Sequence, residues 1–168
     1  MWGSKEKRRR AAGIPPVAHK VRIVKMKLKT YVITLSKTFL QGHPRAGQPT
    51  NFRESFEQGL KIHTIRCNYD LWAKRLDEVI AGRAVLSVRQ WSGKPYGSKQ
   101  ESPIRILTKD DGVGYQKITQ ERLFTDHFII VECGAHHDGL SHIDFYNWFD
   151  HKPTEKPYII IHFTPYRY

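Results

Sequence analysis

The sequence has little cysteine and no long apolar run. Its 168 residues include only Cys67 and Cys133, too few for a disulfide framework. No stretch approaches the roughly 18 consecutive apolar residues that a membrane-spanning helix needs. The basic N-terminal segment is not followed by the apolar core of a signal peptide. We therefore expect a cytoplasmic protein with reduced thiols and no membrane partner.

Several common catalytic signatures are also missing. The sequence contains no glycine-rich phosphate loop, no serine nucleophile elbow and no HExxH motif. His136 and His137 follow Cys133, and Cys67 or His63 could complete a set of four zinc ligands, but the spacing matches no common zinc pattern. We therefore expect no metal and no organic cofactor.

Acidic residues are few: 16 Asp and Glu face 28 Lys and Arg, which gives a net charge of +12. Residues 1–25 carry +7 of this charge and show neither a helical nor a strand period, which predicts a basic flexible tail. Met26, just before the first predicted strand, is a natural alternative start. The remaining 143 residues, 26–168, are of a length typical of one domain. A basic charge favours a polyanionic partner such as nucleic acid, although solubility alone also explains it.

Apolar residues make up 39% of the chain and aromatic residues 12%, enough for a packed core. Alternating or branched apolar runs predict strands at residues 30–36, 61–66, 83–91, 104–108, 115–118, 127–132 and 158–163. Helical spacing predicts helices within 51–58, 68–82 and 141–149, and residues 37–50 are expected to form a loop that covers a site. This order predicts an α+β fold with a mixed sheet curled into a small barrel of about six strands, flanked by two or three helices.

Two pairs of residues have the spacing of helix capping boxes, Asn51 with Glu54 and Ser141 with Asp144. We expect each pair to open a helix. The helices carry large apolar side chains at core spacing, and we expect these in the interior: Trp72, Phe145, Trp148 and Phe149.

The most informative stretch is Gly59-Leu60-Lys61-Ile62-His63-Thr64-Ile65-Arg66, followed much later by Asp138-Gly139-Leu140-Ser141. These motifs resemble the ASCH domain family, relatives of the PUA RNA-binding fold, and in particular the small bacterial ASCH amidohydrolases that deacetylate N4-acetylcytidine. Gly59, Lys61, Thr64 and Arg66 match the family motif, whereas Leu60 replaces a basic residue. The resemblance spans residues 30–163 in order of elements, and the inserted loops are similar to those of longer phage and bacterial ASCH proteins.

The resemblance implies a PUA-like barrel and a role for each matching residue. Lys61 would be the catalytic base, Thr64 the nucleophile and Asp138 the acid, at a position where the amidohydrolases have a longer Glu. Arg66 would position the base or stabilise the oxyanion. The chemistry is consistent, because a Thr hydroxyl needs a neighbouring base and a desolvated Lys can serve as one. In a regular strand residues three apart point to opposite faces, so Lys61 must precede the strand.

The same residues also fit a plain structural interpretation. Thr64 would then be an ordinary strand former, Lys61 would be solvated and Arg66 would pair with a nearby acid. Asp138 would be a turn residue before Gly139.

A second cluster combines basic and aromatic residues around one predicted hairpin: Arg89, Trp91, Lys94, Tyr96 and Lys99. This mixture suits base stacking and phosphate neutralisation, although a solvated loop with one buried Trp also fits.

Two functions follow, an amidohydrolase acting on a modified nucleoside or RNA, and a non-catalytic RNA-binding module. A small-molecule or protein-interaction module is a third. We expect a monomer.

Overall fold

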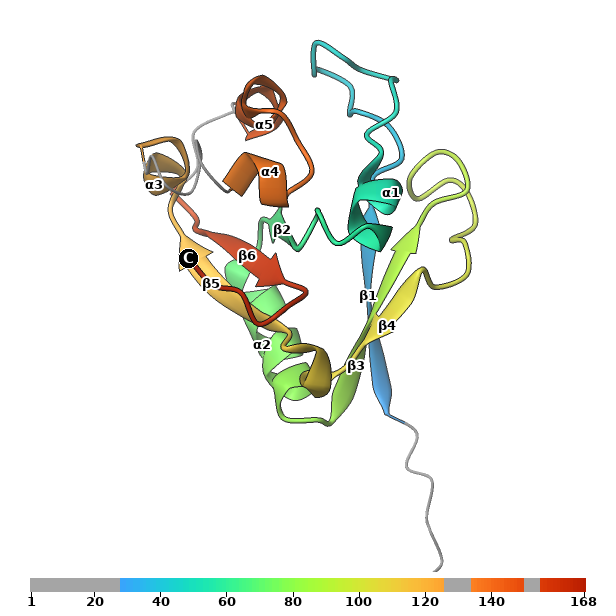
Figure 1. Cartoon of the computed structure of the whole chain (residues 1–168), viewed down its shortest axis with the longest axis vertical. Coiled ribbons are helices and arrows are strands. Elements are labelled where there is room, and N and C mark those ends of the chain that lie inside the picture. The colour runs from blue at the N-terminus through green and yellow to red at the C-terminus, as the bar shows by residue number, and fades with distance from the viewer. Residues whose placement is uncertain (1–27, 126–133, 150–154) are drawn as a thin grey trace, which may run out of the picture.

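The computed structural model describes residues 28–125, 134–149 and 155–168, arranged as two small sheets with helices around them (Figure 1). The strands are β1 (Lys29–Leu35), β2 (His63–Arg66), β3 (Ala84–Gln90), β4 (Arg105–Leu107), β5 (Gly114–Ile118) and β6 (Tyr158–His162). The helices are α1 (Phe52–Glu57), α2 (Tyr69–Ile80), a 3-10 turn at Lys109–Asp111, α3 (Gln120–Thr125), α4 (Ala135–His137) and α5 (His142–Phe149). The expected tail and the strand expected at 127–132 lie outside the described residues.

The first sheet has the order β1-β3-β4 and mixes directions. β1 pairs with β3 in parallel, and β3 pairs with β4 antiparallel. The second sheet has the order β2-β6-β5 and is antiparallel throughout. The α+β class predicted from the sequence is confirmed, but in place of one mixed sheet the described residues form two three-stranded sheets, of which the first is mixed. No ladder joins the two sheets in the described part of the chain, so the closed barrel stays a prediction.

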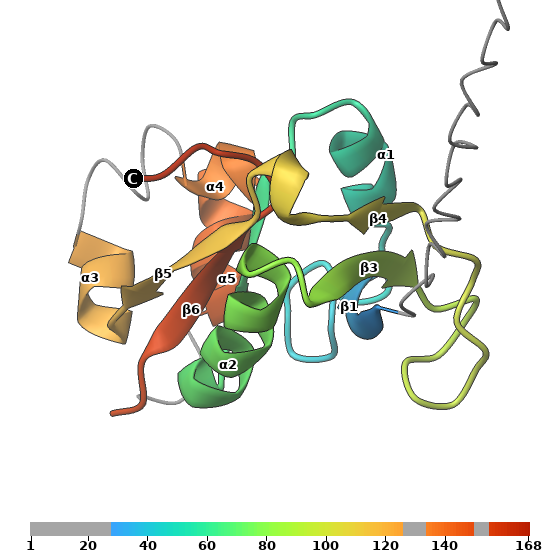
Figure 2. The same ribbon diagram turned by 90° about the horizontal axis from the view of Figure 1, so that it is seen from below.

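The two faces of the second sheet carry different helices. Tyr115 donates a hydrogen bond to Asp77 of α2, and the Lys117 ammonium lies over the ring of Tyr69. Tyr158, on the opposite face of the ladder, packs edge-on against Phe149 of α5. In Figure 1 α4 and α5 lie above β6 and α2 lies below it, and Figure 2 shows the same elements from below, with α2 in front.

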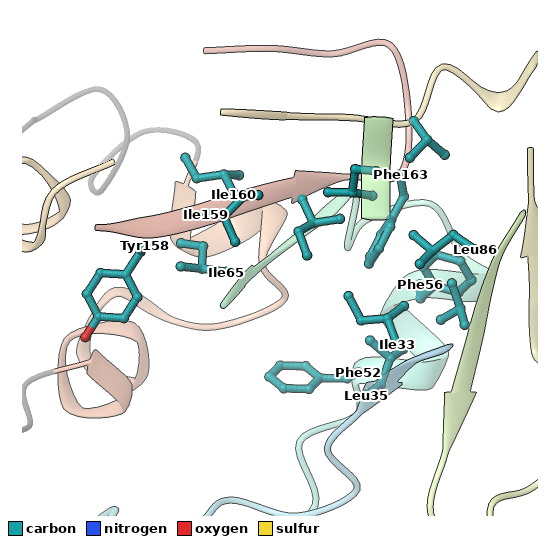
Figure 3. Close-up of a cluster of buried hydrophobic side chains, with 14 of the residues drawn as sticks. Ile33, Leu35, Phe52, Phe56, Ile65, Leu86, Tyr158, Ile159, Ile160 and Phe163 are labelled. Atoms are coloured by element: carbon teal, nitrogen blue, oxygen red, sulfur yellow. The ribbon is translucent and has the colours of Figure 1, made fainter. Parts of the chain in front are cut away.

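The core fills the space between the sheets (Figure 3). Ile33 and Leu35 of β1 are 1% exposed and face Leu86 of β3, while Ile65 and Ile159 come from the second sheet. Each of these side chains contributes about 1.5–3 kcal/mol by leaving water. Phe145 and Phe149 are buried as expected, whereas Trp72 and Trp148 are only half-buried.

One of the two expected capping boxes is wrong. Asn51 adopts a left-handed conformation with φ 56° and makes no side-chain capping bond. The hydroxyl of Thr50 instead accepts from the N–H of Phe52 at 3.4 Å and donates to the carbonyl of Ser36 at 2.6 Å. The Ser141 hydroxyl does accept from the N–H of Asp144, so the second predicted cap is confirmed.

No helix in the described ranges has both the length and the apolar character needed to cross a membrane.

Candidate functional site

Lys61 lies in a tight turn between α1 and β2. The backbone N–H groups of Leu60 and Lys61 both donate to the carbonyl of Ser55, at 2.9 and 3.0 Å. Gly59 has φ 75°, a conformation that favours glycine, and it lets the chain reverse here. The strand begins only at His63, so Lys61 precedes it, as the opposite-face argument requires.

The structure brings Lys61 and Asp138 together as a buried ion pair. The Lys61 Nζ lies 2.5 Å from Asp138 Oδ1 and 2.5 Å from the Asp138 carbonyl oxygen. Lys61 is 2% exposed and Asp138 3%, so Lys61 is not the solvated residue of the plain interpretation. The ammonium also lies 4.2 Å from the ring centre of Phe52, and Gly139 packs against the Lys61 and Phe52 side chains.

Burial and mutual attraction act in opposite directions on this pair. Burial lowers the pKa of Lys61 and raises that of Asp138, while the charge of each partner favours the ionised form of the other. The positive charge of Arg66 adds to the lowering of the Lys61 pKa. These shifts narrow the free-energy gap between the ion pair and the neutral pair, which is what transfer of a proton within the site requires.

Thr64 and Arg66 share one face of β2, because they are two residues apart on a strand. Thr64 is 2% exposed and stands opposite Ile161 in the ladder. Among the described residues, no hydrogen bond joins its hydroxyl to Lys61, whose recorded bonds go to Asp138. The base and the nucleophile of the expected mechanism are therefore near in sequence but not hydrogen-bonded to each other in the described structure.

Arg66, the last residue of β2, is close enough to Lys61 and Asp138 for their charges to interact. Its guanidinium donates to the carbonyls of Thr34 at 2.7 Å and Ile65 at 3.1 Å, and so ties the second sheet to β1. Burial lowers its pKa, and the nearby charge of Asp138 acts in the opposite direction. The Arg66 side chain also lines two neighbouring hollows in the surface.

These hollows form one groove with two chambers. The first, here called the aromatic chamber, has a volume of about 250 Å³ and is lined by Thr34, Leu35, Ser36, Leu40, Arg66, Trp91, Pro95, Tyr96 and Trp148. The second, here called the apolar chamber, has a volume of about 310 Å³ and is lined by Leu40, Ile65, Arg66, Cys67, Trp148, Phe149 and Tyr158. Leu40, Arg66 and Trp148 line both chambers, so the two chambers adjoin across these side chains.

The aromatic chamber brings Arg66 together with two of the five residues of the basic and aromatic cluster. Arg66, Trp91 and Tyr96 line it, and the rings of Trp91 and Tyr96 lie 5.4 Å apart at 51°. Tyr96 is 92% exposed and has φ 60°, which is uncommon for a non-glycine residue. Arg89 instead donates to the Ser87 hydroxyl at 2.9 Å, and Lys94 is exposed on the neighbouring loop; neither lines the groove.

Trp148 and Leu40 are groove residues that the sequence analysis missed. Trp148 has the helical spacing of a core residue, and nothing in the sequence shows that one side of it faces the groove. Leu40 belongs to the loop 37–50, which was expected to cover a site. That loop is held against α5 by a 2.6 Å ion pair between Arg45 and Asp144 and by packing of Phe39 on Trp148.

A buried histidine cluster was also missed. His63 and His162 are opposite each other in the ladder, and both are 0% exposed. The Tyr168 hydroxyl lies 2.9 Å from His63 Nδ1 and 3.2 Å from His137 Nδ1. Within the described residues, His63 Nε2 and both ring nitrogens of His162 lack hydrogen-bond partners. Burial lowers the pKa of His63 well below its usual value and that of His162 to about 3.

The described part of the chain contains no group of three or more His, Cys, Asp or Glu side chains placed to hold a metal ion, and Cys133 lies outside it. In comparisons with known proteins, no family model, no curated protein and no solved structure matches the chain.

Proposed function

We propose that the groove binds a nucleobase, presented either by a modified nucleoside or by single-stranded RNA. The observation that carries this proposal is the composition of the aromatic chamber, in which one guanidinium, that of Arg66, stands among the rings of Trp91, Tyr96 and Trp148. Flat aromatic rings and a planar cation are the groups on which bases stack. A guanidinium also has five N–H donors, so Arg66 retains donors for a base edge after bonding Thr34 and Ile65.

The sequence resemblance supports the same proposal. The motif residues Lys61, Thr64 and Arg66 lie together along one short stretch, and Asp138 contacts the first of them. Arg66 bridges the two sheets that would form the wall of a PUA-like barrel. We infer an ASCH-like domain on these grounds.

A second candidate function is hydrolysis of an N-acyl group such as that of N4-acetylcytidine. The buried pair of Asp138 and Lys61, which precedes Thr64 by three residues, favours it, because both pKa values are shifted toward the neutral forms. The Thr64 hydroxyl would attack the acyl carbon and give its proton to neutral Lys61, while protonated Asp138 donates to the leaving exocyclic nitrogen. Water would then hydrolyse the Thr64 ester, releasing acetate and restoring the hydroxyl.

This hydrolysis needs a rearrangement. Thr64 is 2% exposed and does not line either chamber, and Lys61 is bonded to Asp138. The Lys61 amine would have to turn from Asp138 toward Thr64, and a substrate carbonyl would have to pass Arg66. Binding in the groove requires neither movement, so binding is the better supported function.

The test of binding uses the intrinsic fluorescence of the tryptophans in the groove. We expect cytidine, N4-acetylcytidine or a short single-stranded oligoribonucleotide to quench it saturably, and Trp91→Ala and Arg66→Gln to weaken binding about tenfold or more. Lys74→Gln, an exposed charge change on α2, is the matched control and should leave binding unchanged. Wild-type affinity in both groove variants would contradict the proposal.

The test of hydrolysis is release of cytidine and acetate from N4-acetylcytidine. Turnover that is lost in Thr64→Ala and partly kept in Thr64→Ser would establish the second candidate. Binding without turnover would leave the non-catalytic module.

A further inference from the structure

The apolar chamber lies directly beside the proposed base site and differs from it in character. Its lining consists of aliphatic and aromatic side chains with one thiol, and Arg66 is its one charged residue. Two of the guanidinium nitrogens of Arg66 are already bonded to backbone carbonyls. Because the remaining Arg66 donors are assigned to the base edge, a phosphate or another charged group in the apolar chamber would find no further counter-charge among the lining residues.

The size of the chamber narrows the choice of ligand. Its volume of about 310 Å³ exceeds that of the aromatic chamber, about 250 Å³, which would hold the base. A hydrogen atom or a methyl group on the base edge would leave most of the apolar chamber open to water. An apolar substituent of ring size, entering past Arg66 and Trp148, would cover the exposed apolar wall and release that water.

We propose that the groove is selective for a nucleoside whose base carries a bulky apolar substituent on the edge that borders the apolar chamber. The base occupies the aromatic chamber and the substituent occupies the apolar chamber, with the side chains of Leu40 and Trp148 contacting both parts. This inference rests on the proposed function, because it assigns the base to the aromatic chamber.

Cys67 offers a way to fill the apolar chamber without touching the aromatic one. It is exposed, it directly follows β2, and it lines the apolar chamber but not the aromatic one. A Trp at this position is expected to narrow the apolar chamber, which Cys67 borders. Cys67→Ala removes the thiol and leaves the space open, so it is the matched control.

The experiment compares cytidine, N4-methylcytidine and N4-benzylcytidine by calorimetric titration of the full chain. None of the three carries an acyl group on the exocyclic nitrogen, so binding is measured without hydrolysis. We expect N4-benzylcytidine to bind about tenfold or more tighter than N4-methylcytidine, since the buried ring removes much more apolar surface from water. Cys67→Trp should abolish this advantage and leave the affinity for cytidine unchanged, and Cys67→Ala should keep the advantage.

The outcomes separate the two proposals. Cytidine and N4-benzylcytidine binding with equal affinity would overturn the selectivity and leave the base site intact. Tighter binding of a cytidine dinucleotide than of N4-benzylcytidine, with the same sensitivity to Cys67→Trp, would overturn it in favour of a second nucleotide. No binding of any of the compounds would overturn the proposed function itself.

Discussion

Replacing Asp138 by Asn tests the energetics of the buried Lys61 pair. The substitution keeps the size of the side chain and the backbone carbonyl but removes the negative charge from a site where Lys61 is 2% exposed. Breaking a buried pair costs about 3–5 kcal/mol, because one charge is left without its partner. An upper limit follows from Lys61 itself. Releasing its proton at pH 7 from the ordinary pKa of 10.5 costs about 5 kcal/mol. The penalty for the unpaired buried charge cannot exceed this cost, because Lys61 would otherwise fold in its neutral form.

The free energy of unfolding of Asp138→Asn should depend on pH in a direction that the pKa of Lys61 determines. In Asp138→Asn the unpartnered Lys61 has a lowered pKa when folded and its ordinary one when unfolded. Below that ordinary value the unfolded chain binds more protons, so stability rises with pH. Between pH 7 and 9 the variant should gain up to about 1.4 kcal/mol per pH unit relative to wild type, as the cost of a neutral Lys61 falls.

The assay is urea unfolding of wild type, Asp138→Asn and the double variant Lys61→Met with Asp138→Asn. We expect the double variant to recover most of the lost stability, because no buried charge then remains. It also keeps the test decisive if Asp138→Asn alone does not fold. A loss below 1 kcal/mol in Asp138→Asn, or a loss that does not change between pH 7 and 9, would refute the argument.

Three further predictions concern the buried histidines and a glycine. His162→Leu should raise the free energy of unfolding by about 1–3 kcal/mol, because both ring nitrogens are buried without partners in the described residues. A lower free energy of unfolding in urea would show that a His162 nitrogen does have a partner. The free energy of unfolding should fall below pH 6.5 by up to about 1.4 kcal/mol per pH unit for each of His63 and His162, whose folded pKa values lie below the unfolded ones. In His162→Leu the slope of this free energy against pH should be smaller by the contribution of one histidine. An unchanged slope would contradict the assignment. Gly112→Ala should lower the melting temperature more than Gly59→Ala, since both have positive φ but only at Gly112 would the new Cβ collide with another group, the Pro165 ring; equal shifts in a thermal melt would count against that contact.

Strand and helix positions could be predicted from the sequence because they depend on local patterns. The alternation at 30–36 and the helical spacing at 68–82 correspond to β1 and α2. The pairing of the strands could not be predicted in the same way. Nothing in the order of residues shows that β1 lies parallel to β3 or that β6 lies between β2 and β5, because these contacts join segments far apart in the chain.

The candidate site, too, could be predicted from the sequence only in part. The motif predicted that Lys61 and Asp138 belong together, and they lie 2.5 Å apart although 77 residues separate them. Composition alone could not separate Trp91, which lines the groove, from Arg89, which turns to Ser87 on its own strand. The half-buried position of Trp148 depends on packing of the loop 37–50 against α5, a tertiary contact without a local signal.

The most direct test of the groove is a heteronuclear NMR titration of the full chain with cytidine and N4-acetylcytidine, following the indole N–H signals of the tryptophans. Trp91 and Trp148 line the aromatic chamber, whereas Trp72 on α2 does not and serves as an internal reference. We expect saturable shifts of the Trp91 and Trp148 signals, an unmoved Trp72 signal and no shifts in Arg66→Gln. Shifts of equal size in the Trp72, Trp91 and Trp148 signals, or no shift at millimolar ligand, would contradict base binding in the groove.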